Sequence, residues 1–280
     1  MTRLIIDVLN ICFRNHFIHK GSWNAQPNHD IHSFLRDLLF FMDVMECTRP
    51  VFCFDSEVSH RANEFPYYKN NRTLDPEDRE KVYATAKKLR TQVLPSIGFL
   101  NSFLAEGWEA DDLIAHICLS GSESDSWCIV SSDSDLYQLL SPKVSIWSPV
   151  KKQTFTEKWF EGLYKIPVEK WVLFKAIAGD PADGIKGVPR VGVTGALDYL
   201  RGCLATNKSS YKKIVQDESL SIIAEGQKLI RLPYRQKELA EMDFSLVKDK
   251  ATTAKWNKVM EEYKMPNLID KFQGWKEVEI

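Results

Sequence analysis

Leu4-Ile5-Ile6-Asp7 is a short apolar run that ends in an acid, and it has two counterparts further along the chain. They are Val51-Phe52-Cys53-Phe54-Asp55 and Trp127-Cys128-Ile129-Val130, the latter followed by Ser131-Ser132-Asp133-Ser134-Asp135. Continuous apolar runs of this length are typical of parallel strands that are buried on both faces. The pattern predicts a parallel sheet, with a fourth strand over residues 144–147.

Helical patterns lie between these strands. Residues 31–45 and 111–119 carry apolar side chains at three- and four-residue spacings, which indicates amphipathic helices. Alternating strands and helices predict an α/β fold, a parallel sheet flanked by helices. After about residue 165 the strand signals stop, and helices are expected over 168–178, 194–201 and 219–231. We therefore expect an N-terminal α/β domain (1–165) and a helical C-terminal domain (166–280).

One segment fits neither domain. Asp75-Pro76-Glu77-Asp78 is a helix start, with Asp as the cap and Pro in the first turn. The helix that follows, to about residue 94, carries several basic residues and few apolar ones. We expect it to be an exposed basic helix that stands away from the core.

The composition excludes several classes of protein. The chain has 280 residues, of which 44% are hydrophobic and 27% charged, so it is neither disordered nor too small to bury a core. No apolar run approaches the roughly 18 residues that cross a membrane, and the first residues do not form a signal peptide. The six cysteines show no CxxC pair, which favours reduced thiols in a cytoplasmic protein.

Acidic residues follow all three apolar runs, where the carboxyl ends of parallel strands meet at one sheet edge. Two further groups, one opening the 111–119 helix and one in a Gly-Asp-Pro-Ala-Asp-Gly turn, complete a set of nine: Asp7, Asp55, Glu109, Asp111, Asp112, Asp133, Asp135, Asp180 and Asp183. Taken separately, the three acids at the helix start could simply interact favourably with the helix dipole, and the Asp-Pro-Ala-Asp-Gly segment could be an ordinary turn without a metal.

Convergence of nine acids requires cations. Two like charges ~6 Å apart repel by roughly 3 kcal/mol at an effective dielectric of about 20. Oxygen ligands without nearby His or Cys indicate magnesium or manganese, and the shared carboxylates indicate two ions, as in phosphodiester cleavage. Without these nine acids the formal net charge of −1 becomes +8, so the rest of the surface is basic, as nucleic-acid binding requires.

Residues 4 to about 200 resemble the flap endonuclease / 5′→3′ exonuclease family, which includes bacteriophage 5′ nucleases and the nuclease domain of bacterial DNA polymerase I. Six motifs carry the resemblance, in the family's order: Asp7-Val8-Leu9-Asn10, Phe54-Asp55, Tyr67-Tyr68-Lys69-Asn70-Asn71-Arg72, Glu109-Ala110-Asp111-Asp112, Ser132-Asp133-Ser134-Asp135, and Gly179-Asp180-Pro181-Ala182-Asp183-Gly184-Ile185-Lys186-Gly187-Val188-Pro189. Beyond residue 205 we recognise no family feature.

The resemblance implies a PIN-like (resolvase-like) sheet, a helical arch that includes the basic helix, and a helix-turn-helix module for duplex binding. It implies two-metal hydrolysis of DNA at a 5′ flap, overhang or end, with RNA·DNA hybrid as a further substrate, in phage-type replication, repair or degradation. By motif match, a first Mg²⁺ is held by Asp7, Asp55, Glu109, Asp111, Asp112 and Asp133, and a second by Asp135, Asp180 and Asp183, with Asp133 between the two. Mn²⁺ is expected to substitute, and we expect a monomer in the cytoplasm, of the host if the source is viral.

The run of residues 67–72 supports this chemistry. Lys69 and Arg72 can neutralise the scissile phosphate, with Arg giving a bidentate grip, and Tyr68 offers a ring for an unpaired base. In isolation, the same run is a surface loop of mixed polarity.

The turn after residue 186 is the expected duplex contact, because glycines allow close approach to phosphates and a helix N-terminus follows. The candidate DNA contacts are Lys175, Lys186, Gly187, Val188, Arg190, Gly192 and Thr194. In the family this turn also commonly holds K⁺. Here it departs from the family pattern, with Arg190 at a usual glycine and Thr194 at a usual lysine, so Arg190 is the candidate replacement for the lost contact.

Three alternatives stay open at this point. A PIN-type ribonuclease shares the acids but usually lacks the arch and the hairpin. A haloacid-dehalogenase-like phosphatase would use Asp7 as a nucleophile, but it needs a second Asp where Leu9 stands. A non-catalytic DNA-binding protein predicts missing ligands, whereas all nine acids are present.

Overall fold

A computed structural model of the chain describes residues 2–20, 28–47, 49–122 and 125–273. A single six-stranded sheet lies at its centre, in the order β3-β2-β1-β4-β5-β6. The five strands from β3 to β5 pair in parallel, and β6 is antiparallel to β5. The strands are β1 (Thr2–Asp7), β2 (Pro50–Cys53), β3 (Ser102–Phe103), β4 (Ser126–Val130), β5 (Val144–Ser148) and β6 (Gln153–Phe155).

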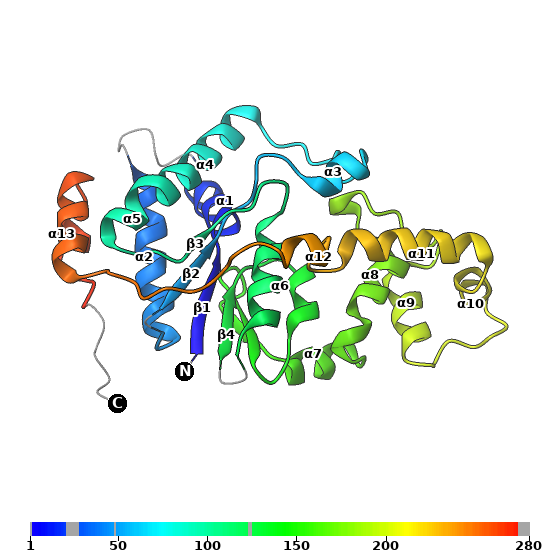
Figure 1. Cartoon of the computed structure of the whole chain (residues 1–280). Helices are drawn as coiled ribbons and strands as arrows, with labels where there is room; N and C mark the ends of the chain where they lie inside the picture. Colours follow the sequence, from blue (N-terminus) through cyan, green and yellow to red (C-terminus); the bar gives the residue numbers. More distant parts are fainter. Residues whose placement is uncertain (1, 21–27, 48, 123–124, 274–280) are drawn as a thin grey trace.

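Helices cover both faces of the sheet (Figure 1). In the N-terminal part they are α1 (Val8–His19), α2 (His29–Val44), α3 (His60–Glu64), α4 (Pro76–Lys88), α5 (Leu94–Ile97), α6 (Ala110–Ser120) and α7 (Glu157–Tyr164). In the C-terminal part they are α8 (Trp171–Ala178), α9 (Gly192–Leu200), α10 (Ser209–Ile214), α11 (Asp217–Ile230), α12 (Gln236–Leu239) and α13 (Thr253–Glu262). The sheet and its flanking helices confirm the α/β fold class.

Alternate side chains of β1 enter two separate cores. Leu4 and Ile6 pack in a core with α1, α2, α4, α5 and α13, while Ile5 packs in a core with α6, α8, α9 and α11. Burial on both faces explains why the strand sequences are continuously apolar. The second core contains residues from both sides of the expected boundary at residue 165, so the two expected domains share one hydrophobic core.

The expectation for the basic helix is wrong. α4 packs against α1 instead of standing away from the core, and its contact surface continues through a π-helical turn (Leu89–Val93). Val82, Ala86, Leu89 and Val93 are all buried, at spacings of three and four residues. This narrow apolar stripe is enough to dock the helix. Asp75 caps α4 as expected, because its carboxylate accepts a hydrogen bond from the Glu77 amide at 2.9 Å.

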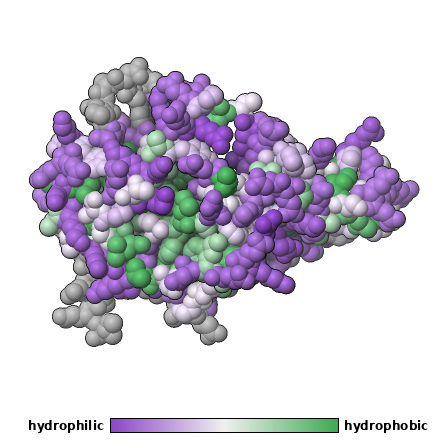
Figure 2. All heavy atoms as spheres, turned by 45° about the horizontal axis from the view of Figure 1, so that its top comes forward, coloured by the Kyte–Doolittle hydropathy of each residue, from purple (hydrophilic) through white to green (hydrophobic). Residues whose placement is uncertain are grey.

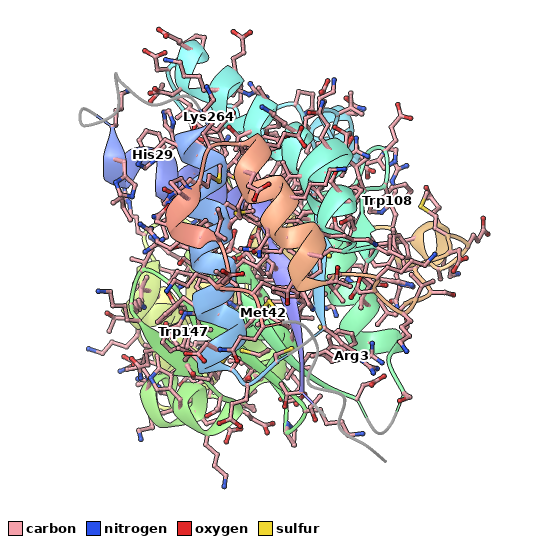
Figure 3. The ribbon with its side chains drawn as sticks, turned by 90° about the vertical axis from the view of Figure 1, so that its left-hand side faces the viewer. Arg3, His29, Met42, Trp108, Trp147 and Lys264 are labelled. Carbon is pink, nitrogen blue, oxygen red and sulfur yellow. The ribbon has the colours of Figure 1, made fainter. Side chains whose placement is uncertain are left out.

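The C-terminal segment returns to the N-terminal part. After α12 the chain runs beside the edge strand β3, where Asn101 and the Val247 backbone exchange two hydrogen bonds. α13 then packs in the same core as α2 and α5, with Trp256 fully buried. Figure 3 views the molecule from this end, with α13 in front of α2. Within the described ranges, no helix has the length and apolar content needed to cross a bilayer.

Candidate metal centre

Three neighbouring parallel strands deliver their acids to one edge of the sheet. Asp7 ends β1, Asp55 lies two residues beyond β2, and Asp133 and Asp135 follow β4. Burial and the nearby Asp55 raise the pKa of Asp7 to about 7. Burial and Glu109 raise the pKa of Asp55 to about 6. Asp7, Asp55 and Glu109 therefore lie close enough for their charges to interact, and their role as metal ligands stays a prediction.

Asp7 and Asp55 also shape the backbone around the site. Asp7 caps α1 by accepting a hydrogen bond from the Asn10 amide at 3.1 Å, and it accepts another from the Ser131 hydroxyl at 2.9 Å. Asp55 accepts one from the Ala110 amide at 3.3 Å, at the start of α6. The strand ends and the helix starts are therefore held together by the same carboxylates.

Asp111 lies in the first turn of α6 with a buried oxygen, Oδ1, that has no hydrogen-bond partner. Burial and the adjacent Asp112 raise the pKa of Asp111 well above its usual range. The nearest cationic atom, of the Arg61 guanidinium, is 3.9 Å from this oxygen, which is too far for a hydrogen bond, so burial and the neighbouring acids dominate. Asp7, Asp55 and Asp111 are thus three carboxyls whose pKa values burial raises, and a cation near them would offset that burial.

Glu109 has cationic partners already. Its carboxylate accepts hydrogen bonds from Lys69 Nζ at 2.6 Å and from the hydroxyls of Tyr68 and Ser59 at 3.1 and 3.2 Å. Burial alone would raise its pKa, but Lys69 and Arg61 outweigh this effect and lower the pKa to about 2. Glu109 is therefore ionised and connects α6 to the basic loop of residues 67–72.

Asp112 is placed differently from the other acids. It is fully buried, and its two oxygens accept hydrogen bonds from the guanidinium of Arg61 at 2.6 and 2.7 Å. Oδ1 also accepts from the Tyr234 amide at 2.7 Å, and Oδ2 from the Glu109 amide at 3.2 Å. Both oxygens thus have protein partners.

A second carboxylate group forms beside the first. Among the described residues, only Asp135, Asp180 and Asp183 form a set whose ligand atoms all lie within 4.8 Å of one another. Burial and Asp133 raise the pKa of Asp135 to about 7. Asp133 also raises the pKa of Asp7, so its charge acts on both groups. The place of Asp133 between the two groups stays a prediction.

Lys175 lies inside the second group rather than at the surface. Its ammonium group contacts Asp135, and it lies 2.6 Å from Asp180 Oδ2, with 8% of the side chain exposed. Burial would raise the pKa of Asp180, but Lys175 outweighs it and lowers that pKa. The placement of Lys175 as a DNA contact therefore does not match the structure, because its charge faces the acids.

The basic loop docks on the turn that carries the second group. Arg72 pairs with Asp183, the Lys69 amide donates to the Asp183 carbonyl at 3.0 Å, and Asn71 donates to the Pro181 carbonyl. Lys69 and Arg72 therefore lie beside the acids, as expected. Tyr68 does not match its expected role, because its ring is buried with 5% exposed and its hydroxyl is committed to Glu109.

The connection between α8 and α9, together with the first turn of α9, holds the remaining expected DNA contacts. Lys186, Arg190, Gly192 and Thr194 are exposed there, whereas Gly187 and Val188 are buried. Gly187 has φ +64°, and a Cβ at this position would lie 2.3 Å from the Gly179 nitrogen, so glycine is required. The Val188 amide donates to the Ile177 carbonyl at 2.8 Å. The helix-turn-helix character of this segment stays a prediction.

The sequence reading misses Arg61, Ser59 and Ser131. Arg61 is the buried partner of Asp112, and the two serines donate to Glu109 and Asp7. Arg61 precedes the basic loop and Ser131 precedes Asp133, so nearness to a motif is the only signal in the sequence. Their partners are distant in the chain.

This site is a set of buried oxygen ligands, without histidine or cysteine, at the edge of a parallel sheet and beside a basic loop. It defines a resolvase-like α/β protein with a site suited to hard divalent cations. The chain belongs to the 5′-3′ exonuclease family, because residues 2–165 match the model of the 5′-3′ exonuclease N-terminal resolvase-like domain. The family resemblance is confirmed.

Curated relatives agree with this membership. A 5′-3′ exonuclease of Halalkalibacterium halodurans is 32% identical over 249 residues, covering 79% of this chain and 80% of that protein. The thermostable DNA polymerase I of Thermus thermophilus is 30% identical over 202 residues, covering 71% of this chain. The chain spans 24% of the length of that polymerase.

Solved structures share the fold. The D15 protein of T5, crystallised with metal ions, superposes with a TM-score of 0.71 at 21% identity, covering 97% of this chain and 99% of that one. The catalytic core of Rad2 in complex with DNA substrate superposes with a TM-score of 0.58 at 15% identity, covering 95% of this chain and 90% of that one.

Proposed function

We propose that this chain is a metal-dependent 5′→3′ exonuclease and flap endonuclease that hydrolyses phosphodiesters by a two-metal mechanism. The observation that carries the proposal is the pair of carboxylate groups at one sheet edge, with Lys69 paired to Glu109 in one and Arg72 paired to Asp183 in the other. The names of the curated relatives, 5′-3′ exonuclease and DNA polymerase I, support the same activity.

We assign two Mg²⁺ ions to these groups, with Mn²⁺ as a substitute. Asp7, Asp55, Glu109, Asp111 and Asp133 would hold one ion, and Asp135, Asp180 and Asp183, with Asp133, would hold the other. When bound, the ions would supply an activated water and stabilise the charge that develops on the phosphate. Asp112 serves this set indirectly, because both of its oxygens accept hydrogen bonds from Arg61 and the backbone.

The cations of the loop have acidic partners that a phosphate can replace. Lys69 pairs with Glu109 and Arg72 pairs with Asp183, so each carboxylate group has one cation of the loop beside it. Half of the Arg72 side chain is exposed, at 51%, which leaves it accessible to an incoming backbone. We infer that they turn to the scissile phosphate and orient it over the acids.

Two surfaces would receive the nucleic acid. A cleft of about 330 Å³ opens beside Asp55 and is lined by Tyr83, Lys87 and Arg90 of α4 and its π-helical extension, which suits a single strand. The exposed α8–α9 connection, with Lys186 and Arg190, suits a duplex, and the K⁺ site belongs to this part of the proposal. Figure 2 shows a mainly hydrophilic face that narrows toward α9, α10 and α11.

The proposed substrate is DNA with a 5′ flap, overhang or end, and RNA·DNA hybrid is included. We propose that the chain acts as a monomer in the cytoplasm, in phage-type replication, repair or degradation. Cleavage of a labelled 5′-flap DNA, an overhang DNA and an RNA·DNA hybrid, each with MgCl₂, MnCl₂ or EDTA, tests the substrate class. Cleavage of the RNA strand of the hybrid, with neither DNA substrate cut, would favour a PIN-type ribonuclease instead.

The metal assignment is tested at Asp133. Asp133→Asn keeps the size of the side chain and should lower the turnover number by a factor on the order of 10³, because it weakens both cation sites. DNA affinity measured in EDTA should be unchanged. Asp243→Asn, at an exposed acid outside the site, is the matched control. Near-normal cleavage by the Asp133 variant would contradict the two-metal assignment.

A further inference from the structure

Arg61 is the most enclosed cation of the site, with 2% of its surface exposed. It extends from α3, whose cap residue Ser59 also donates to Glu109. Its guanidinium donates two hydrogen bonds to the Asp112 carboxylate, from Nη1 at 2.6 Å and from Nη2 at 2.7 Å. This is the bidentate geometry in which an arginine fixes both the position and the plane of a carboxylate.

The Arg61 side chain also contacts α11, the first residues of α6 and the ring of Tyr234. Nε donates to the Leu229 carbonyl at 2.9 Å, in the last turn of α11, where a cation is favoured. Nη1 lies 3.6 Å from Glu109 Oε2 and 3.9 Å from Asp111 Oδ1. The guanidinium carbon lies 4.8 Å from the centre of the Tyr234 ring. One side chain therefore connects α3, the acidic start of α6 and the end of α11.

Asp112 is suited to anchoring this side chain and poorly suited to binding a metal ion. Each of its oxygens accepts one hydrogen bond from Arg61 and one from a backbone amide, that of Tyr234 or that of Glu109. The Glu109 contact belongs to the capping box that starts α6. Asp112 thus fixes the backbone from which Glu109 and Asp111 extend.

We propose that Arg61 and Asp112 act as one positioning pair, which sets Glu109 and Asp111 for cation binding without contacting the cation. This inference rests on the proposed function. It also gives the end of α11 a role, because Leu229 and Tyr234 complete the surroundings of the pair. Partners that orient metal ligands commonly account for 10- to 100-fold in metal affinity.

The alternative, in which Asp112 is itself a metal ligand, predicts the opposite change in metal affinity when the Arg61 charge is removed. If Asp112 binds the ion, the Arg61 charge competes with it, and removing that charge should tighten metal binding. If the two form a positioning pair, removing either should weaken metal binding. Removing both should then be no worse than removing one, because the same interaction is lost.

The test is a double-mutant cycle with Arg61→Met, Asp112→Asn and the double variant. Mg²⁺ binding to metal-free protein is measured by calorimetry, without DNA, and DNA affinity is measured in EDTA. We expect each single variant to bind Mg²⁺ about 10- to 100-fold more weakly, the double variant to match the weaker single variant, and DNA affinity to be unchanged. Arg235→Met is the matched control, because Arg235 pairs with Glu64 and so also joins α3 to the segment after α11.

Several results would overturn the inference. They are tighter or unchanged binding in Arg61→Met, additive losses in the double variant, or an equal loss in Arg235→Met. If Arg61→Met does not fold, Arg61→Lys keeps the charge but not the bidentate contact, and wild-type Mg²⁺ affinity in that variant would equally refute the pair. Failure of the wild-type protein to bind Mg²⁺ would instead refute the proposed function.

Discussion

Replacing Lys175 by methionine should make the stability of this protein depend on divalent ions. The Lys175 ammonium group contacts Asp135 and lies 2.6 Å from Asp180, in a site from which most water is excluded. Methionine keeps the unbranched apolar stem and removes only the charge. The variant therefore leaves Asp135, Asp180 and Asp183 without their internal counter-ion.

The size of the effect follows from this burial. Removing one partner of a buried ion pair costs about 3–5 kcal/mol of unfolding free energy. Burial and Asp133 already raise the pKa of Asp135 to about 7 despite Lys175, so in the variant this carboxyl takes up a proton, which moderates the loss. A loss of about 3 kcal/mol corresponds to a decrease in Tm of about 6–12 °C in EDTA.

A divalent ion should restore this loss, because it supplies the charge that methionine lacks. Thermal unfolding followed by circular dichroism, in EDTA and in MgCl₂, should show a larger Mg²⁺-dependent rise in Tm for Lys175→Met than for the wild type. Lys170→Met removes a lysine that donates to the Leu200 carbonyl and should shift Tm equally in both buffers. An equal decrease in both buffers for Lys175→Met would refute the reasoning.

Three further predictions concern single side chains. Tyr68→Phe removes the hydroxyl that donates to Glu109 and keeps the buried ring, so cleavage should slow by about tenfold or less while DNA affinity is unchanged. A loss of affinity in a binding titration would instead show that the hydroxyl contacts the DNA. Arg190→Gly should reduce the slope of log affinity against log salt by about one unit, and unaltered salt plots would show that Arg190 does not contact the duplex. Burial raises the pKa of Asp249 above 3.8, its value in the unfolded chain, so ionisation of this carboxyl lowers the free energy of unfolding. The stability that depends on its protonated form is fully present below pH 3.8 and is lost as the pH rises through the higher folded-state pKa. Asp249→Asn keeps an acceptor for the Leu100 amide and should raise Tm at pH 7 but not below pH 3.8; a lower Tm at pH 7 would contradict this assignment.

The convergence of the acids could be predicted from the sequence because it depends on two regularities. Apolar runs such as Leu4-Ile5-Ile6 predict parallel strands, and parallel strands end on one edge of a sheet. An aspartate directly after such a run has no freedom to lie elsewhere. The helical nature of the C-terminal part was equally local, because it depends on three- and four-residue spacings. β3, with two residues, is too short to leave a pattern.

Only the tertiary structure decided which acids have protein counter-ions and which lack one. The contact of Arg61 with Asp112 spans 51 residues of sequence, and its contact with Leu229 spans 168. The same holds for the burial of Lys175 and Tyr68, which the sequence reading placed at the surface. Local spacing determines which side of an element a residue occupies. It carries no information on which distant charge comes to lie opposite, because that depends on how separately formed elements pack.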